Sequence, residues 1–193
     1  MRSVILATLM AFFAVAANAF EAEDRAIFGP GGAERQLRIV SSADISFFEP
    51  MIRAYRTQNP TVTVDYTVAS SSEVMRAVFD EGVAFDIAIS SAMDLQVKLA
   101  NDGLALPHVS NATARLPEWA KWNDTVFAFT QEPAAIVLSK ALFDGLNMPE
   151  NRNALITVLR ENPDLFQGRV GTYDVRQSGL GYLFATQDAR VSE

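Results

Sequence analysis

Three strand-and-helix units follow one another between residues 37 and 103, and this alternation constrains the fold more than any other feature of the sequence. Each unit begins with a short apolar run, and the three runs are Leu37–Ser42, Val62–Val68 and Phe85–Ser91. A segment with apolar residues at helical spacing follows each run and ends at an Asn-Pro pair or a glycine. Strands that alternate with helices form parallel sheets with right-handed crossovers. The sequence therefore predicts an α/β fold with a parallel sheet.

The second and third runs predict strands with different burial. Val62, Val64, Tyr66 and Val68 alternate with polar residues, so they share one face of a strand. Phe85–Ser91 is almost continuously apolar, which is typical of a strand covered on both faces. We therefore expect the third strand to be buried on both sides.

Small polar residues stand at the carboxyl end of each predicted strand. They are Ser42 and Asp44 after the first strand, Ser70, Ser71 and Ser72 after the second, and Ser90 and Ser91 after the third. Parallel strands end at one edge, and ligands bind α/β sheets in the crevice outside that edge. Each loop also opens a helix, whose free N–H groups favour an anion. Serine is a preferred helix cap, so capping explains any single cluster, whereas three clusters at one edge favour binding.

The N-terminus has the three parts of a secretory signal, namely Arg2, an apolar run over Val4–Ala17 and an Ala-Asn-Ala end at residue 19. This pattern predicts a signal peptide over residues 1–19 and a periplasmic mature chain that begins at Phe20. The apolar run is shorter than the ~20 residues of a spanning helix, and an uncleaved membrane anchor is the alternative. Residues 20–36 are polar and contain Gly-Pro-Gly-Gly, so we expect a flexible leader there.

Composition removes several function classes. The formal net charge is −7 and no basic cluster is present, so nucleic acid and anionic membranes are poor partners. The chain has no cysteine and a single histidine, His108, which leaves no material for disulfides, thiolate sites or multi-histidine metal sites. No cofactor is expected. A secreted serine hydrolase is the enzymatic alternative, and the absence of a G-x-S-x-G motif argues against it.

The pattern changes beyond Asp102. Trp119 and Trp122 lie in one short segment, and we expect them to pack in a core or under a lid, with ligand stacking as the alternative. The further predicted elements are strands at Val126–Phe129, Ala134–Leu138 and Arg169–Tyr173, a helix around Asn153–Arg160 that stops before Pro163, and a helix after Ser178.

Four segments resemble the periplasmic solute-binding proteins of ABC importers, which have a two-lobed fold called type II. They are LRIVSSADISFFEPMIRAYRTQNPTVTVDY, FDIAISSAMDLQVKLANDG, FAFTQEPAAIVLSKALF and GRVGTYDVRQSGLGYLFA. The resemblance is greatest to the branch that includes ferric-ion, spermidine and organic-anion binders. It implies a parallel-sheet lobe one at residues 37–130, then a hinge crossing and an incomplete lobe two at residues 131–193. In this family the two lobes close on the ligand.

The resemblance also implies ligand-binding residues. They are the polar residues of the three strand-end loops, Gln131 and Glu132 at the hinge, and Asp174, Arg176, Ser178, Gly179 and Tyr182 in lobe two. For Asp174 the alternatives are a helix cap or a partner for Arg176. The fork of Arg176 suits a carboxylate or a phosphate, and the alternative is an exposed turn residue.

Such a protein is a receptor without catalytic activity. The resemblance implies capture of a small polar, anionic solute for an inner-membrane ABC permease, or its presentation to a membrane sensor kinase. We expect a monomer without bound nucleic acid or metal. The family's ferric binders use a tyrosine pair, whereas the four tyrosines here are scattered at Tyr55, Tyr66, Tyr173 and Tyr182. The chain is shorter than is usual in the family, so we expect a fragment, a truncated gene product or a reduced relative.

Overall fold

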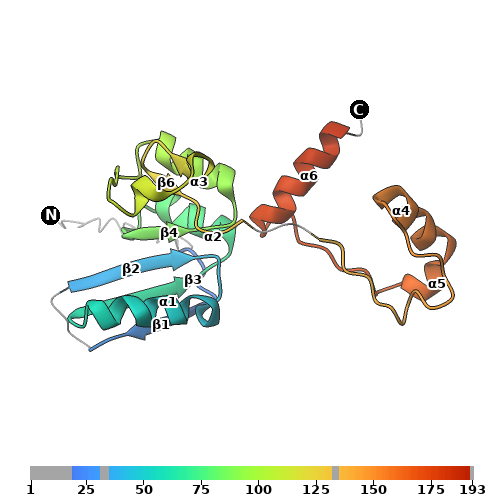
Figure 1. Cartoon of the computed structure of the whole chain (residues 1–193), viewed down its shortest axis with the longest axis horizontal. Coiled ribbons are helices and arrows are strands. Elements are labelled where there is room, and N and C mark those ends of the chain that lie inside the picture. The colour runs from blue at the N-terminus through green and yellow to red at the C-terminus, as the bar shows by residue number, and fades with distance from the viewer. Residues whose placement is uncertain (1–18, 31–34, 132–134, 192–193) are drawn as a thin grey trace, which may run out of the picture.

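The computed structural model describes residues 19–30, 35–131 and 135–191 (Figure 1). Residues 19–130 contain every described strand and are called the sheet region, whereas residues 135–191 contain only helices and loops and are called the helical region. The sheet region comprises β1 (Asp24–Phe28), β2 (Arg35–Ser41), α1 (Ile45–Gln58), β3 (Val62–Val68), α2 (Ser71–Met75), the π-helix η1 (Arg76–Asp80), β4 (Ile87–Ile89), α3 (Met93–Asn101), the short 3-10 helices η2 (Thr113–Arg115) and η3 (Glu118–Ala120), β5 (Lys121–Trp122) and β6 (Val126–Phe127). Within the described ranges, no helix has both the length and the apolar character that a membrane crossing requires.

The main sheet has four strands in the order β1-β3-β2-β4. β2 pairs in parallel with β3 and with β4, so the predicted parallel α/β arrangement is confirmed. β1 pairs antiparallel with β3, and Asp24 lies opposite Val68 at one end of this pairing. The expectation of a flexible leader over residues 20–36 is therefore wrong for residues 24–28, which form an edge strand.

An ion pair explains why this segment folds onto the sheet. The carboxylate of Asp65 in β3 accepts hydrogen bonds from the Arg25 guanidinium in β1 at 2.7 and 2.5 Å, and from the Gln36 amide at 3.1 Å. Asp65 is buried, and a buried carboxylate needs such partners because its lost hydration is otherwise uncompensated. The same hydrogen bonds raise the pKa of Arg25 above its ordinary value. β1 thus supplies a partner that β3 requires.

Strand burial differs from the sequence prediction. β3 is buried at every residue because it lies between β1 and β2 and because α1 packs against it. β4 is a short strand at the sheet edge, where Ile87 is 42% exposed. The predicted burial of Phe85–Ser91 on both faces is therefore wrong. A continuous apolar run does not reveal which strand of a sheet remains at the edge.

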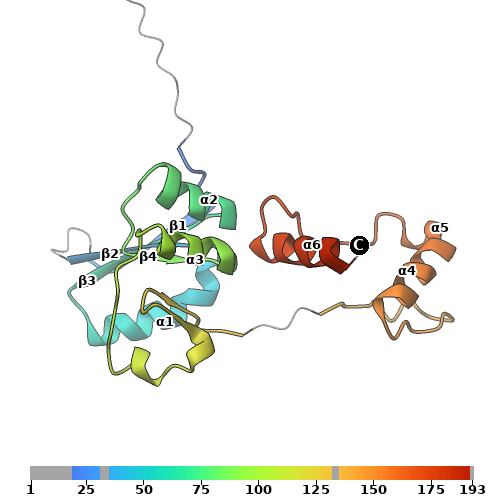
Figure 2. The same ribbon diagram turned by 90° about the horizontal axis from the view of Figure 1, so that it is seen from above.

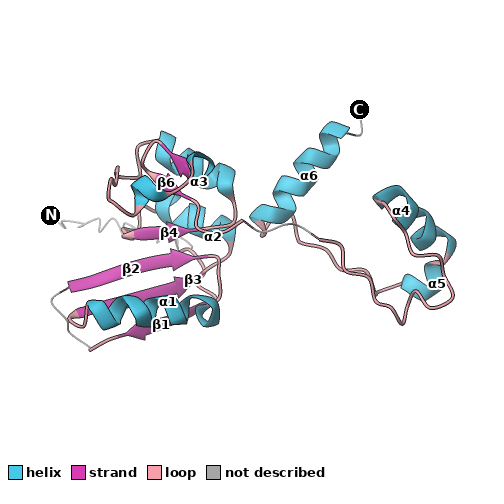
Figure 3. Cartoon of the chain, viewed as in Figure 1, coloured by secondary structure: helices cyan, strands magenta, loops and turns pink. Residues whose placement is uncertain are grey.

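Two apolar clusters hold helices against the sheet. Figure 3 shows α1 packed in front of β3 and β1. Ile39 belongs to the cluster with α1, and its neighbour Val40 belongs to the cluster with α2. Adjacent residues of a strand point to opposite faces, so the two clusters cover opposite faces of β2. In the first cluster the Phe48 ring of α1 stacks on Tyr66 with centroids 5.5 Å apart. The clusters therefore fix the helix starts relative to the strand ends.

The helical region consists of α4 (Arg152–Glu161), α5 (Pro163–Phe166) and α6 (Gly179–Val191). Its predicted helices are confirmed, including the end of α4 before Pro163 and the start of α6 after Ser178. The predicted strand at Arg169–Tyr173 is wrong, because this segment pairs with no other described segment. Figure 2 shows α4 and α5 well separated from the sheet, whereas the first turn of α6 approaches it.

The segment between the two regions also departs from the prediction. The run Val126–Phe129 is shortened to the two residues of β6, which pair antiparallel with β5. Residues 135–138 form no strand, and Ala134 and Glu132 lie outside the described residues. The hinge crossing predicted here is therefore described only in part.

The two tryptophans do not enter a core. Trp119 is 63% exposed in η3, and Trp122 is exposed in β5, where its indole N–H donates to the Asn101 side chain at 3.1 Å. Ala120 between them is the buried residue of the segment. The predicted core or lid packing of the tryptophans is wrong, because both side chains remain exposed in a 3-10 turn and a short strand.

Candidate ligand-binding cleft

The three strand-end loops meet at the carboxyl edge of the sheet, as the strand-and-helix alternation predicts. The N–H of Ser91, after β4, donates to the hydroxyl of Ser42, after β2, at 3.2 Å. The hydroxyls of Ser71, at the start of α2, and Ser91 lie 3.4 Å apart. Three serines from three separate loops are therefore joined in one chain of hydrogen bonds.

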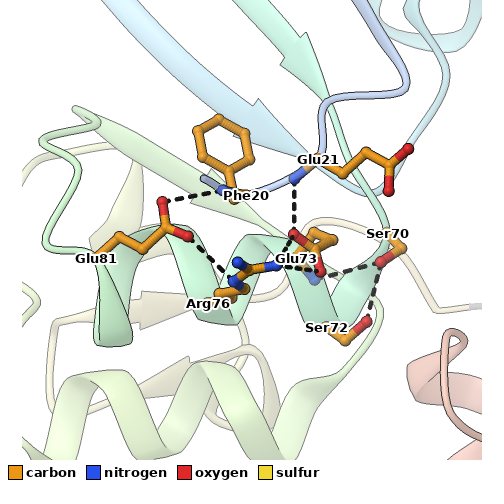
Figure 4. Close-up of polar contacts among 7 residues, drawn as sticks. All are labelled: Phe20, Glu21, Ser70, Ser72, Glu73, Arg76 and Glu81. Atoms are coloured by element: carbon orange, nitrogen blue, oxygen red, sulfur yellow. Dashed lines mark hydrogen bonds and ion pairs between the residues drawn. The ribbon is translucent and has the colours of Figure 1, made fainter. Parts of the chain in front are cut away.

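Two other serines cap the turns that follow them. The Ser70 hydroxyl accepts the N–H of Glu73 at 3.3 Å and lies 3.0 Å from the Ser72 hydroxyl (Figure 4). The Ser90 hydroxyl accepts the N–H of Ala92 at 3.1 Å. The helix-capping alternative therefore accounts for Ser70, the N-cap of α2, whereas the Ser90 contact lies within the loop before α3.

A cavity of about 140 Å³ lies between the sheet region and the helical region. Its lining residues come from the first turns of α2 and α3 on one side, and from the loop before α6 and its first turn on the other. They are Ser71, Ser72, Ala92, Asp94 and Leu95 from the sheet region, and Val175, Arg176, Gln177, Ser178, Gly179 and Tyr182 from the helical region. The structure thus brings the second serine loop and the predicted lobe-two residues Arg176, Ser178, Gly179 and Tyr182 to one place.

The two sides of the cavity touch at Gly179. A Cβ atom at this position would lie 2.4 Å from the Ala92 Cβ and 2.5 Å from the Ala92 Cα. Ala92 is fully buried at the start of α3, and its backbone cannot move aside easily. Glycine is therefore the residue that allows the first turn of α6 to rest on α3.

The lining includes one cation and one carboxylate. The guanidinium of Arg176 donates to the Asp174 carboxylate at 3.1 Å, and the backbone N–H of Arg176 donates to it at 2.8 Å. These hydrogen bonds hold the pKa of Asp174 below its ordinary value. Asp174 thus takes the alternative role of a partner for Arg176, while Asp94 supplies the carboxylate of the cavity lining.

A family model described as bacterial extracellular solute-binding protein matches residues 40–192. The chain belongs to this family. Its structure is similar to that of the substrate-binding protein of an ABC transporter from Agrobacterium tumefaciens, with 35% sequence identity and a TM-score of 0.80 over 88% of this chain. The match covers 52% of that protein, so the chain spans about half its length. A comparison with the curated proteins gives no match.

The match confirms the periplasmic-binding-protein-like fold class. Other predicted residues lie elsewhere. Asp44 lines a separate surface cavity of about 480 Å³ together with Glu23, Asp24 and Glu49. Gln131 is exposed and lines neither cavity. Within the described residues, no group of three or more His, Cys, Asp or Glu is arranged to hold a metal ion.

Some residues that line the cavity of this solute-binding protein were not predicted from the sequence. Ala92, Asp94 and Leu95 follow the third serine loop directly, and Val175 and Gln177 flank Arg176. Asp94 lies in the first turn of the helix that the third serine loop opens, so its position was accessible from the sequence. The approach of α6 to α3 was not, because no residue pattern records it.

Proposed function

We propose that the chain forms part of an exported solute-binding protein that captures a small polar, anionic solute for an inner-membrane ABC importer. The observation that supports this function is the cavity formed jointly by the α2 and α3 starts and by the loop before α6. A receptor that closes on its solute needs groups from both sides, and this cavity has them.

The chemistry of the lining supports an anion. Ser71, Ser72 and Ser178 supply hydroxyl groups, and Arg176 supplies five N–H donors in a fork that matches a carboxylate or a phosphate. Arg176 is 85% exposed, so it can exchange Asp174 for an incoming anion at little desolvation cost. Asp94 on the opposite side favours a solute that also carries a donor group, such as a hydroxyl or an ammonium.

The same geometry supports a binding role over hydrolysis. The hydroxyl of Ser71 faces that of Ser91, and Ser70 and Ser90 accept backbone N–H groups. The ring of His108 lies against Phe127, with centroids 6.5 Å apart. A nucleophilic serine needs a base within hydrogen-bonding distance, and these contacts place each serine beside other groups.

Export is the second part of the proposal. We infer that residues 1–19 are removed as a signal peptide and that the mature chain begins at Phe20 in the periplasm. Membership of an extracellular solute-binding family supports this location.

A thermal-shift panel tests the proposal on the full chain purified from the periplasm. The probes are inorganic phosphate, phosphate esters, di- and tricarboxylates, neutral sugars and polyamines. A solute at one hundred times its dissociation constant adds about 2.7 kcal/mol, which raises Tm by about 5–10 °C for a chain of this size. We expect this shift from an anionic probe.

Two variants locate the site. Ser71→Ala should weaken binding of that probe by about 1.5–3 kcal/mol because it removes a hydrogen bond to a charged group. Ser46→Ala is the matched control, since Ser46 lines the other cavity. A shift produced only by sugars or polyamines would contradict the anionic solute, and loss of binding in the Ser46 variant alone would contradict the site.

A further inference from the structure

The segment after the predicted cleavage site lies against α2 and η1 (Figure 4). The backbone nitrogen of Phe20 donates to the Glu81 carboxylate at 3.0 Å, and that of Glu21 donates to the Glu73 carboxylate at 2.7 Å. The Phe20 ring packs edge-on against Phe85, with centroids 5.9 Å apart. The start of the predicted mature chain is therefore held by two hydrogen bonds and one aromatic contact.

The two carboxylates are themselves held in place. Arg76 of η1 lies 3.1 Å from Glu81 and 3.4 Å from Glu73. The side chain of Glu81 is only 23% exposed, so it is partly removed from water. Two carboxylates share one guanidinium here, so one negative charge is not neutralised. A second positive charge beside Glu81 would neutralise it.

Cleavage after Ala19 would supply that charge. Water adds across the Ala19–Phe20 peptide bond, the carboxylate remains on Ala19, and the Phe20 nitrogen becomes an α-ammonium group. We propose that Glu81 is the docking site of this α-ammonium group, so that removal of the signal peptide strengthens the packing of the sheet region. The inference rests on the proposed export and cleavage. A charge-assisted hydrogen bond is roughly twice as strong as the neutral one that the uncut chain makes at the same place.

The docking site adjoins the ligand-binding cleft. Glu73 accepts the N–H of Glu21 with its carboxylate, and donates its own N–H to the Ser70 hydroxyl. The same turn presents Ser71 and Ser72 to the cavity. The docked N-terminus thus positions the turn that carries two of the proposed solute contacts.

The ion pair predicts a pH dependence with a definite sign. The charged groups around the Phe20 nitrogen are Glu81 and Arg76 of η1, Glu73 of α2 and Glu21 of its own segment. An α-amino group has an ordinary pKa of about 7.7–8.0. Pairing with Glu81 raises that pKa in the folded state. The stabilisation is therefore complete below about pH 7.7 and is lost as the pH rises through the folded pKa.

The test begins with the intact mass of the protein secreted to the periplasm, which should correspond to a start at Phe20. Tm is then measured at pH 6.5 and 9.5 for this protein and for Glu81→Gln. We expect the substitution to lower Tm by about 2–4 °C more at pH 6.5 than at pH 9.5. Glu21→Gln is the matched control, because it removes the same charge beside the same terminus but leaves the backbone contact of Glu21 intact, and it should show no such difference.

An NMR titration of the α-amino group in the unchanged protein provides a second readout that does not require Glu81→Gln to fold. A pKa above about 8 supports the inference. A mature chain that starts elsewhere would overturn the proposed cleavage and the inference together. A chain that starts at Phe20 with an ordinary α-amino pKa, or with equal Tm losses at both pH values, would overturn the inference alone.

Discussion

The sheet region and the helical region differ in how far their apolar side chains are buried. In the sheet region β3 is buried along its whole length between two neighbours, and two clusters pack on the sheet. In the helical region, Phe143 and Phe166 are the buried hydrophobic residues among those described, whereas Val137 and Val170 are largely exposed. The comparison shows that an apolar run becomes a strand only when another strand offers it a hydrogen-bonding edge. Arg169–Tyr173 has no such edge among the described residues.

Amide hydrogen exchange should separate the two regions most strongly. Amides of β3 are protected by a ladder on each side and by burial, so their exchange requires extensive unfolding. Amides of residues 169–178 lack a ladder. We expect exchange in β3 to be slower by a factor of at least ~100. Equal protection in the two segments, measured by mass spectrometry, would contradict the greater stability of β3.

Replacing Arg25 by methionine should destabilise the sheet region, because the buried carboxylate of Asp65 then keeps Gln36 as its remaining partner. Leaving a buried charged group incompletely paired costs about 1–3 kcal/mol of unfolding free energy. Arg115→Met is the control, because Arg115 is exposed in η2 and donates to the Asn111 carbonyl, so its loss should change stability by no more than about 0.5 kcal/mol. Urea denaturation that gives equal losses for the two variants would show that β1 is not required by β3.

Replacing Gly179 by alanine should impair contact between the two regions. The added methyl group would clash with Ala92, so α6 could not rest on α3. We expect the affinity for the best solute of the thermal-shift panel to fall at least ~10-fold, or about 1.4 kcal/mol. Gly171→Ala is the control, because a Cβ there meets nothing within 4 Å. Unchanged affinity in calorimetry of Gly179→Ala would show that this contact is not part of the binding state.

The smallest effect is expected at the ion pair between Arg152 of α4 and Asp188 of α6. Hydrogen bonds from Arg152 hold the pKa of Asp188 below its ordinary value. The pair therefore stabilises the helical region above about pH 4 and ceases to do so as the pH falls through the lowered pKa. In Arg152→Met, the NMR titration of the Asp188 carboxyl should move up toward about 3.9. An unchanged midpoint would mean that the pair does not join α4 to α6 in solution.

Much of the fold could be predicted because it depends on local patterns. Period-two alternation located β3, helical spacing located α1 and α3, and the order of these elements placed the serine loops at one edge. β1 could not be found in this way, because its position depends on Asp65 of another strand. The edge position of β4 and the exposure of Trp119 also depend on which segments become neighbours in the folded chain.

The residues of the candidate site also fall into two groups, those that local sequence patterns predict and those whose positions depend on contacts between distant segments. Ser71 and Ser72 could be named because strand ends converge in a parallel sheet. Asp44 is predicted at the same site, yet it lines a different cavity together with Glu49 of α1. The role of Gly179 as the contact point with Ala92 required the distance between two segments far apart in the sequence.

We propose that the solute binds in the cavity between α2, α3 and the start of α6. Amide chemical-shift mapping with the strongest anionic probe of the panel can locate the bound solute. We expect the largest shift changes at Ser71, Arg176 and Gly179. Changes centred instead on Asp44 and Glu49, in the separate acidic cavity, would contradict it.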